Sequence, residues 1–233
     1  MSTPGYHYLL EKGLTIETLR EFAIAYRDTQ GTLHGSTFPE KLKSLLTDKF
    51  NGCVLLPVHD LYGNPVSIMG RRLEGNPKFE YLVGFKAHNY LFGLHKTVGE
   101  LVRNDWVVLT EGPFDMMSCY QHGIKNVVSI LGTSLTHMQL CLLKRFVNKW
   151  LIVLDGDAAG QAATKQLTTL GKKYGILVKT LALPAGFDPD QFLKQEGLKG
   201  WSTLCAKQLK NIFAAPLVPT TTGTFFTPEK PRY

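Results

Sequence analysis

The sequence predicts an α/β fold, in which a parallel sheet flanked by helices follows an α+β subdomain of helices and antiparallel strands. From Trp106 onward, short apolar runs alternate with longer segments of helical periodicity, a pattern typical of parallel strands joined by right-handed helical crossovers. Before Trp106, two strand-like runs flank the turn Tyr62-Gly63-Asn64-Pro65, which indicates an antiparallel hairpin. The chain has 233 residues, enough to bury the core of one large or two small domains.

Two short helices are predicted at the start of the chain. The first ends at Gly13, because glycine readily adopts the left-handed conformation that closes a helix. Thr15 is a good N-cap for the second helix, and Leu14 and Leu19 can form a hydrophobic staple across it. The other elements expected in this part are a helix around residues 42–46 and strands at residues 53–58 and 66–70.

The second part of the chain alternates between strands and helices. We expect strands at about 106–110, 126–131, 150–154 and 176–182, and helices at about 114–122, 135–147 and 158–174. The expected organisation is a basic subdomain over residues 1–104, a parallel-sheet domain over 105–193, a helical segment over 194–213 and a tail over 214–233. The tail is rich in Pro and Thr and has no periodicity, which is typical of disorder.

Acidic residues follow three of the predicted parallel strands. Glu111 and Asp115 come after the first, Asp155 and Asp157 after the third, and Asp188-Pro189-Asp190 after the fourth. The carboxyl ends of parallel strands are where open α/β sheets bind their ligands. Acids that converge there repel one another unless a hard divalent cation such as Mg²⁺ lies between them. Taken alone, an Asp-x-Asp is usually a solvated loop, and an Asp-Pro-Asp is usually a turn with a helix N-cap.

The first two acidic motifs together resemble those of a known domain. Glu-Gly-x-x-x-Asp after one strand and Asp-Gly-Asp after another are similar to the motifs of the Toprim domain, which occurs in topoisomerases, bacterial primases and related nucleases. Between them, residues 129–134 (Ser-Ile-Leu-Gly-Thr-Ser) resemble the Ser-Leu-Gly-Thr-Ser of the bacterial-type, DnaG-like primases. The order, spacing and strand context make the combination specific, although each motif alone is weak. The resemblance covers about residues 6–205 and corresponds to the primase catalytic core.

The resemblance implies a metal-dependent active site at this edge of the sheet. The expected catalytic groups and metal ligands are Glu111, Asp155 and Asp157, and the expected further metal ligands are Asp115, Asp188 and Asp190. Glu111 is the candidate to assist proton removal, and Asp115 is either a neighbour of the metal or an acid at a helix terminus. The expected ion is Mg²⁺ or Mn²⁺. No zinc is expected, because the four cysteines form no Cys-x-x-Cys pair and no histidine lies at zinc-finger spacing.

Basic and aromatic residues are interleaved in the segment before Trp106. This pattern suits a single strand of nucleic acid, since rings stack on bases while cations follow the phosphates. From composition alone, ordinary surface cations on a β-rich subdomain are the favoured interpretation. The primase resemblance implies instead that Arg71, Lys78 and Lys86, with the adjacent Arg72, hold template DNA and nucleotide phosphates. Residues 79–81 (Phe-Glu-Tyr) depart from the family's Tyr-Leu-Asn, so no role is carried over from that asparagine.

Composition and charge narrow the function less than the motifs do. The formal net charge is +7, and residues 191–233, with 6 basic and 2 acidic residues, contribute +4 of it. This is compatible with nucleic-acid binding but does not demonstrate it. No apolar run approaches the roughly 20 residues of a membrane helix, and the N-terminus has no signal-peptide pattern. A cytoplasmic location without a membrane partner is therefore expected, and the lack of a P-loop motif argues against a P-loop helicase.

The function implied by the resemblance is that of a DNA primase. Such an enzyme is a nucleotidyltransferase that synthesises short RNA primers from NTPs on a single-stranded DNA template, in contact with a replicative helicase or another replisome protein. We expect a monomer without the family's zinc-binding and helicase-binding domains, as in a compact primase of a phage, plasmid or other mobile element, or one subunit of a split system. The alternatives are a Toprim-type metal-dependent nuclease, which the basic segment disfavours, and a non-catalytic nucleic-acid-binding accessory protein, which the crowded acids disfavour.

Overall fold

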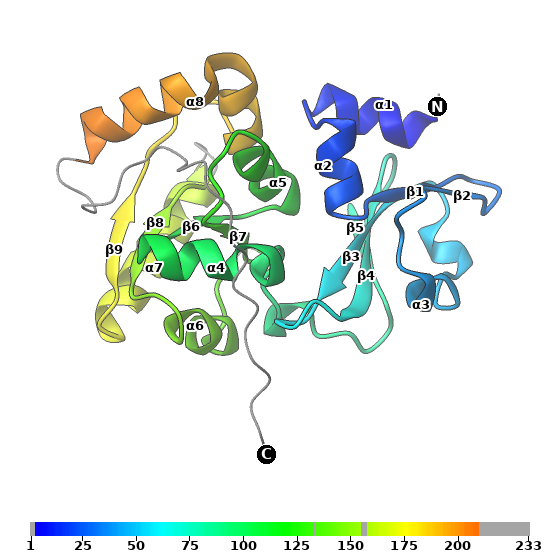
Figure 1. The fold of residues 1–233 in the computed structure, drawn as a ribbon, viewed down its shortest axis with the longest axis horizontal. Coiled ribbons are helices and arrows are strands. Elements are labelled where there is room, and N and C mark those ends of the chain that lie inside the picture. The colour runs from blue at the N-terminus through cyan, green and yellow to red at the C-terminus, as the bar shows by residue number, and fades with distance from the viewer. Residues whose placement is uncertain (1–2, 133, 155–157, 210–233) are drawn as a thin grey trace.

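The computed structural model describes residues 3–132, 134–154 and 158–209 of the chain. Within these residues the strands form two sheets that lie beside each other (Figure 1). One is a five-stranded antiparallel sheet in the order β2-β1-β3-β4-β5, and the other is a four-stranded parallel sheet in the order β7-β6-β8-β9. We call the part from α1 to η2 the antiparallel half and the part from α4 to α8 the parallel half. The predicted fold class is confirmed.

The antiparallel half begins with two helices that pack on its sheet. Its elements are α1 (Pro4–Glu11), α2 (Ile16–Glu21), β1 (Ala25–Arg27), β2 (Leu33–His34), α3 (Glu40–Lys43), η1 (Asp48–Phe50), β3 (Cys53–His59), β4 (Pro65–Arg72), β5 (Phe79–Tyr81) and η2 (Ala87–Asn89). Gly13 has a φ of 79° just after α1, as its position predicted. Thr15 caps α2 by accepting a hydrogen bond from Thr18 N at 3.3 Å, which confirms the predicted N-cap.

Strand β3 is covered on both faces, which explains its continuous apolar sequence. Val54 and Leu56 point into the core that the two halves share, whereas Cys53 and Leu55 point into a smaller core beneath α3. A strand buried on both sides needs no polar face and therefore no alternation of polar and apolar residues.

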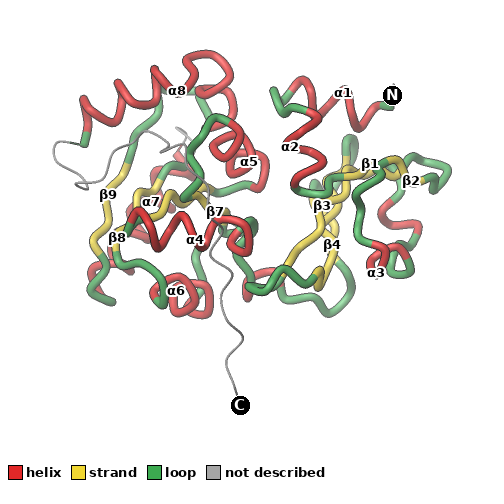
Figure 2. The backbone as a smooth tube through the Cα atoms, in the orientation of Figure 1, coloured by secondary structure: helices red, strands yellow, loops and turns green. Residues whose placement is uncertain are grey.

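The parallel half has helices on both faces of its sheet, as Figure 2 shows. Its elements are α4 (Leu94–Asn104), β6 (Val107–Thr110), α5 (Pro113–Gln121), β7 (Val127–Ser129), α6 (His137–Lys144), β8 (Lys149–Ile152), α7 (Ala158–Lys173), β9 (Leu177–Thr180) and α8 (Pro189–Gln208). Val108 faces a core with α5 and α8, and its neighbours Val107 and Leu109 face a core with α4, α6 and α7. The strands and helices predicted from Trp106 onward are confirmed, with ends shifted by a few residues.

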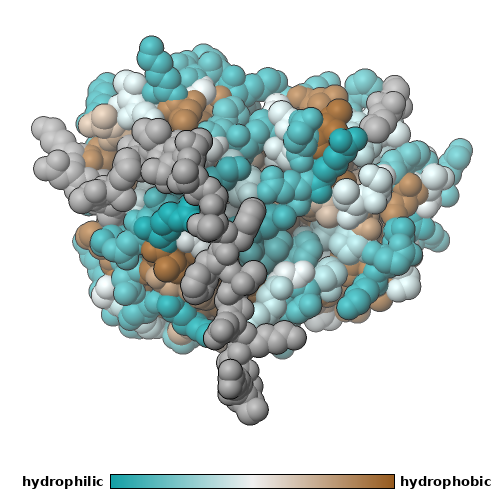
Figure 3. Space-filling view, in the orientation of Figure 1, coloured by the Kyte–Doolittle hydropathy of each residue, from teal (hydrophilic) through white to brown (hydrophobic). Residues whose placement is uncertain are grey.

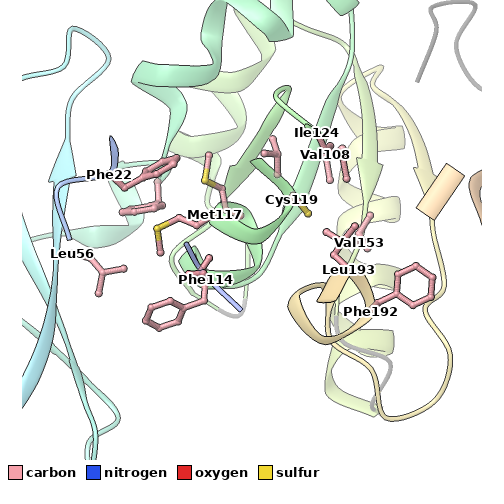
Figure 4. Close-up of a cluster of buried hydrophobic side chains, with 14 of the residues drawn as sticks. Phe22, Leu56, Val108, Phe114, Met117, Cys119, Ile124, Val153, Phe192 and Leu193 are labelled. Carbon is pink, nitrogen blue, oxygen red and sulfur yellow. The ribbon is translucent and has the colours of Figure 1, made fainter. Parts of the chain in front are cut away.

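One hydrophobic core contains residues of both halves, among them Phe22 of the antiparallel half and Met117 of the parallel half (Figure 4). Phe22, which follows α2, stacks on Phe92 at a centroid distance of 5.9 Å, and it makes a T-shaped contact with Tyr120 of α5 at 5.1 Å. Gly93, which precedes α4, has a φ of 83°, and a Cβ atom there would lie 2.2 Å from Cε of Met116. Glycine is therefore required at the point where the chain passes from one half to the other.

Helix α8 begins earlier than the helical segment expected at residues 194–213. It starts at Pro189 and is interrupted at Gly197, which has a φ of 62° and a ψ of −169°. The proposed domain boundaries stay a prediction, and residues 214–233 lie outside the described residues. Among the residues described, no helix is both long and apolar enough to cross a membrane. Figure 3 shows apolar residues as separate patches on a largely hydrophilic face.

Candidate active site

Three aspartates at the N-termini of helices α5 and α8 lie close together in the parallel half. Asp115 lies in the first turn of α5, Asp188 is the N-cap of α8, and Asp190 lies in the first turn of α8. One carboxylate oxygen of each lies within 4.8 Å of the others. Helices α5 and α8 follow strands β6 and β9, so the cluster occupies the carboxyl edge of the sheet, where ligands of such sheets bind.

Local capping interactions fix two of these side chains. Asp115 Oδ2 accepts a hydrogen bond from Gly112 N at 3.2 Å, which closes the turn into α5. Asp188 Oδ1 accepts one from Gln191 N at 2.8 Å, and the Gln191 side chain accepts one from Asp188 N at 3.3 Å. The N-cap interpretation of Asp-Pro-Asp is therefore correct for Asp188. Capping leaves each carboxylate able to use its other lone pairs for a further ligand.

Asp190 differs from Asp115 and Asp188, because its carboxylate is buried and lacks well-oriented hydrogen-bond donors among the described residues. Its side chain is 3% exposed, and neither oxygen accepts a well-oriented hydrogen bond from the described residues. Burial and the adjacent Asp188 carboxyl raise the pKa of Asp190 to about 7, against the opposing effect of Lys12. Burial also acts to raise the pKa of Asp188, but hydrogen bonds from Asp190 and Gln191 and the charge of Lys12 bring that pKa below its usual value.

Lys12, at the end of α1, is a site residue that the sequence analysis missed. Its Nζ lies 2.9 Å from Asp190 Oδ2 and 3.7 Å from Asp188 Oδ2. Burial acts to lower the pKa of Lys12, but Asp190 and Asp188 outweigh it and the pKa is raised. A pocket of about 300 Å³ opens at this point, lined by Tyr8, Glu11, Lys12, Asp190, Gln191 and Lys194. Only the tertiary fold brings α1 to α8, so no spacing in the sequence signals this contact.

The other predicted carboxylates are placed only in part. Glu111 directly follows β6, is half-buried, and its carbonyl oxygen accepts a hydrogen bond from Ser129 Oγ at 2.8 Å. Val153 N donates to Leu109 O at 2.9 Å, which continues the pairing of β8 with β6. Asp155 and Asp157, which come next in the sequence, lie outside the described residues. The roles predicted for these three acids stay predictions.

Two of the four predicted basic residues have defined partners. The Arg71 guanidinium lies 5.0 Å from the ring of Phe79 and 6.0 Å from the ring of Tyr8. Because Tyr8 also lines the pocket beside Lys12, Arg71 adjoins the acidic site through this one ring. Arg72 binds Glu80 at 2.9 Å and donates to Lys49 O at 2.9 Å, an arrangement that stabilises the sheet edge.

Lys78 and Lys86 are both exposed, on either side of β5. Near Lys86, three rings form a stack in which Tyr81 and Phe85 lie 6.3 Å apart and Phe85 and Tyr90 lie 5.1 Å apart. The segment thus combines solvated cations with aromatic surface, as the sequence pattern predicted.

Comparisons with known proteins agree with this architecture. A family described as Toprim-like matches residues 108–193. The chain is 34% identical to the DNA primase of Clostridium acetobutylicum over 217 residues, which cover 84% of this chain and 36% of that protein. The fold also matches a crystal structure of the Aquifex aeolicus primase (zinc-binding and RNA polymerase domains), with a TM-score of 0.74, 28% identity and coverage of 87% of this chain and 55% of that one. The DnaG primase catalytic domain bound to ssDNA matches with a TM-score of 0.70 and 26% identity, over 88% of this chain and 73% of that one.

The fold and the acidic cluster define a Toprim protein. More specifically, the chain belongs to the bacterial-type, DnaG-like primases, of which it has the catalytic core with its Toprim domain. It spans about a third of the length of the curated relatives it matches.

Proposed function

We propose that this chain is the catalytic core of a DNA primase, which joins NTPs into short RNA primers on a single-stranded DNA template. One observation carries the proposal: Asp190 of the aspartate cluster lines one pocket with Lys12 and Tyr8 of the antiparallel half, and Arg71 lies against the Tyr8 ring. Acidic groups for a metal and cationic groups for phosphates are thereby brought together, as nucleotidyl transfer requires. The ssDNA bound to the related DnaG catalytic domain supports the choice of template.

The residues present fit a hard divalent cation. Asp115, Asp188 and Asp190 offer three carboxylates within 4.8 Å, and the two buried oxygens of Asp190 lack well-oriented donors among the described residues. These three acids would hold Mg²⁺ or Mn²⁺, and Glu111, Asp155 and Asp157 are the further ligands proposed from the sequence. A bound ion would supply neutralisation of the charge that develops on the phosphate oxygens.

The remaining tasks fall to side chains of this chain. Arg71, Lys78 and Lys86 are proposed to hold template and nucleotide phosphates, which supplies affinity without sequence information. Glu111 is the proposed group for removing a proton from the attacking 3′-hydroxyl. The half-buried Arg72 is engaged with Glu80, so its contribution is to hold the edge strand β5 on β4, the strand that carries Arg71.

The decisive test is synthesis of RNA. The protein is incubated with single-stranded DNA, labelled NTPs and Mg²⁺ or Mn²⁺, and the products are separated on a denaturing gel. Short labelled products that disappear in the Asp188→Asn, Asp190→Asn double variant are expected. Shortened DNA in place of RNA would identify a Toprim nuclease, and DNA binding without either product would identify a non-catalytic accessory protein.

Initiation is expected to be weak without a partner. Two nucleotides and a template must be held together before the first bond forms, which costs more entropy than adding one nucleotide to an existing 3′ end. We therefore propose that a replicative helicase or another replisome protein raises the primer yield of this monomeric core. A comparison of yields with and without a helicase checks this. The origin of the chain in a phage, plasmid or other mobile element stays a prediction.

A further inference from the structure

The ammonium group of Lys12 lies beside the carboxylate oxygens that a metal ion would bind. Lys12 makes two ion pairs with the aspartate cluster, to Asp190 at 2.9 Å and to Asp188 at 3.7 Å. The ammonium group is half-buried, and Asp190 is almost wholly buried. A carboxylate so enclosed has few open directions, so an ammonium group and a metal ion compete for the same oxygens.

The turn that carries Lys12 is held on the parallel half by its backbone. Gln121 of α5 donates to Gly13 O at 2.9 Å and accepts from Thr15 N at 2.7 Å. Lys194 of α8 donates to Glu11 O at 2.7 Å. These contacts fix the end of α1 on both sides of Lys12, so the position of its ammonium group over the cluster is built into the fold.

We propose that Lys12 is a resident counter-ion of the aspartate cluster, which a divalent cation displaces from Asp190 when it binds. The proposal rests on the metal site of the proposed function and makes Lys12 a positioning residue that sets metal affinity. Like charges within about 4 Å repel even where the effective dielectric constant is about 20, so the ammonium group must move when the ion enters. The adjoining pocket of about 300 Å³ gives it a place to move to without leaving the site.

The first test measures Mn²⁺ affinity of the full chain by isothermal titration calorimetry, at about pH 8, where the acids are ionised. Lys12→Met removes the charge and keeps most of the side chain, so Mn²⁺ should bind about fivefold more tightly or better. Lys12→Arg should stay within about twofold of the parent, because the charge is kept. Lys199→Met is the control: this lysine is exposed on the same helix as Asp190 but does not line the pocket, so its loss should leave the affinity unchanged. Equal or weaker Mn²⁺ binding by a folded Lys12→Met variant would overturn the proposal.

A second test uses the unaltered chain and does not depend on how the variant folds. Reductive methylation of lysines, read by mass spectrometry, is compared with and without saturating Mg²⁺. Lys12 should react faster when the ion is bound, whereas Lys199, which is exposed and does not line the pocket, should not change. Protection of Lys12 by Mg²⁺, or an unchanged rate at saturation, would contradict displacement. Neither test requires primer synthesis, so a chain that binds metal but makes no RNA would refute the proposed function and leave this inference standing.

Discussion

The antiparallel half and the acidic site of the parallel half arrange their charges in opposite ways. In the antiparallel half, charged groups find partners close by in the sequence: Arg72 binds Glu80 across a strand pair, and His34 binds Asp28 across a short loop. In the parallel half, three aspartates crowd together, and the cation that pairs with two of them comes from the other half. Local pairs stabilise an element, whereas a like-charged cluster is costly and persists where a ligand uses it. The difference separates the charges that hold the fold from those that form the site.

The largest effect that tests this difference is expected when one acid of the cluster is removed. Asp190→Asn should lower Mn²⁺ affinity, and with it primer synthesis, by about 100-fold or more, since disturbing even the groups around metal ligands costs about 10- to 100-fold. The stability of the metal-free chain should be unchanged or higher, because one of three crowded charges is gone. Calorimetry with Mn²⁺ and urea unfolding in EDTA measure the two effects.

The matched control for that change is Asp105→Asn. Asp105 is exposed and forms an ion pair with Lys149. Its backbone is left-handed, with a φ of 59°, a conformation that asparagine also tolerates. It lies in the same half but takes no part in the cluster, so metal affinity should not change. Retained Mn²⁺ binding in Asp190→Asn, or equal losses in both variants, would refute the assignment of the site.

This contrast also explains what the sequence could and could not predict. The strands from Trp106 onward and the capping role of Asp188 follow from local patterns, because an apolar run or an Asp-Pro pair carries its own structural preference. The approach of Lys12 to Asp190 joins α1 to α8, and no local rule encodes it. Asp115, Asp188 and Asp190 meet at the sheet edge where acids were expected. The contact of Lys12 with them and the ring of Tyr8, which links Arg71 to the pocket, were not predicted.

The junction between the halves offers a second test, at the level of stability. Gly93→Ala should lower the free energy of unfolding by about 2 kcal/mol or more, because a left-handed backbone costs other residues about 1–2 kcal/mol. The new Cβ would also meet Met116 Cε at 2.2 Å. Gly99→Ala, inside the helix α4 that follows Gly93, is the control: a Cβ there meets nothing within 4 Å, so the change should stabilise by roughly 0.5–1 kcal/mol. Urea unfolding of both variants checks the pair, and equal effects would contradict a specific role for Gly93.

The antiparallel half meets α4 at a pair of histidines, which predicts a pH dependence. His59 and His95 have ring centroids 4.3 Å apart. Burial, the His59 ring and Lys96 lower the pKa of His95 from 6.5 to about 3. Between these values the unfolded chain binds a proton that the folded chain does not, so stability should fall as the pH drops below about 6.5.

The slope that one such group can contribute is at most about 1.4 kcal/mol per pH unit. His95→Phe should remove most of this contribution, whereas His88→Phe, on an exposed side chain, should not. Unfolding free energies measured between about pH 4.5 and 7 provide the check. An identical pH profile in His95→Phe and the parent chain would show that the pair does not respond to acid in this range.

The smallest expected effect separates binding cations from structural ones within the antiparallel half. Lys78→Ala and Lys86→Ala remove exposed charges, so each should weaken single-stranded DNA binding and reduce the slope of log affinity against log salt by about 0.7, one phosphate contact. Their unfolding free energy should stay within about 0.5 kcal/mol of the parent, as is usual for surface changes.

Arg72→Ala should instead lower stability and leave DNA binding nearly unchanged. It leaves Glu80, whose side chain is 17% exposed, without its partner and should cost about 1–3 kcal/mol of stability, while the salt slope stays nearly constant. Fluorescence anisotropy over a range of salt concentrations, paired with urea unfolding, measures both quantities for all three variants. If Arg72→Ala lowered the slope as much as the lysine changes did, Arg72 would contact phosphate as well as Glu80, and the separation between the two kinds of cation would fail.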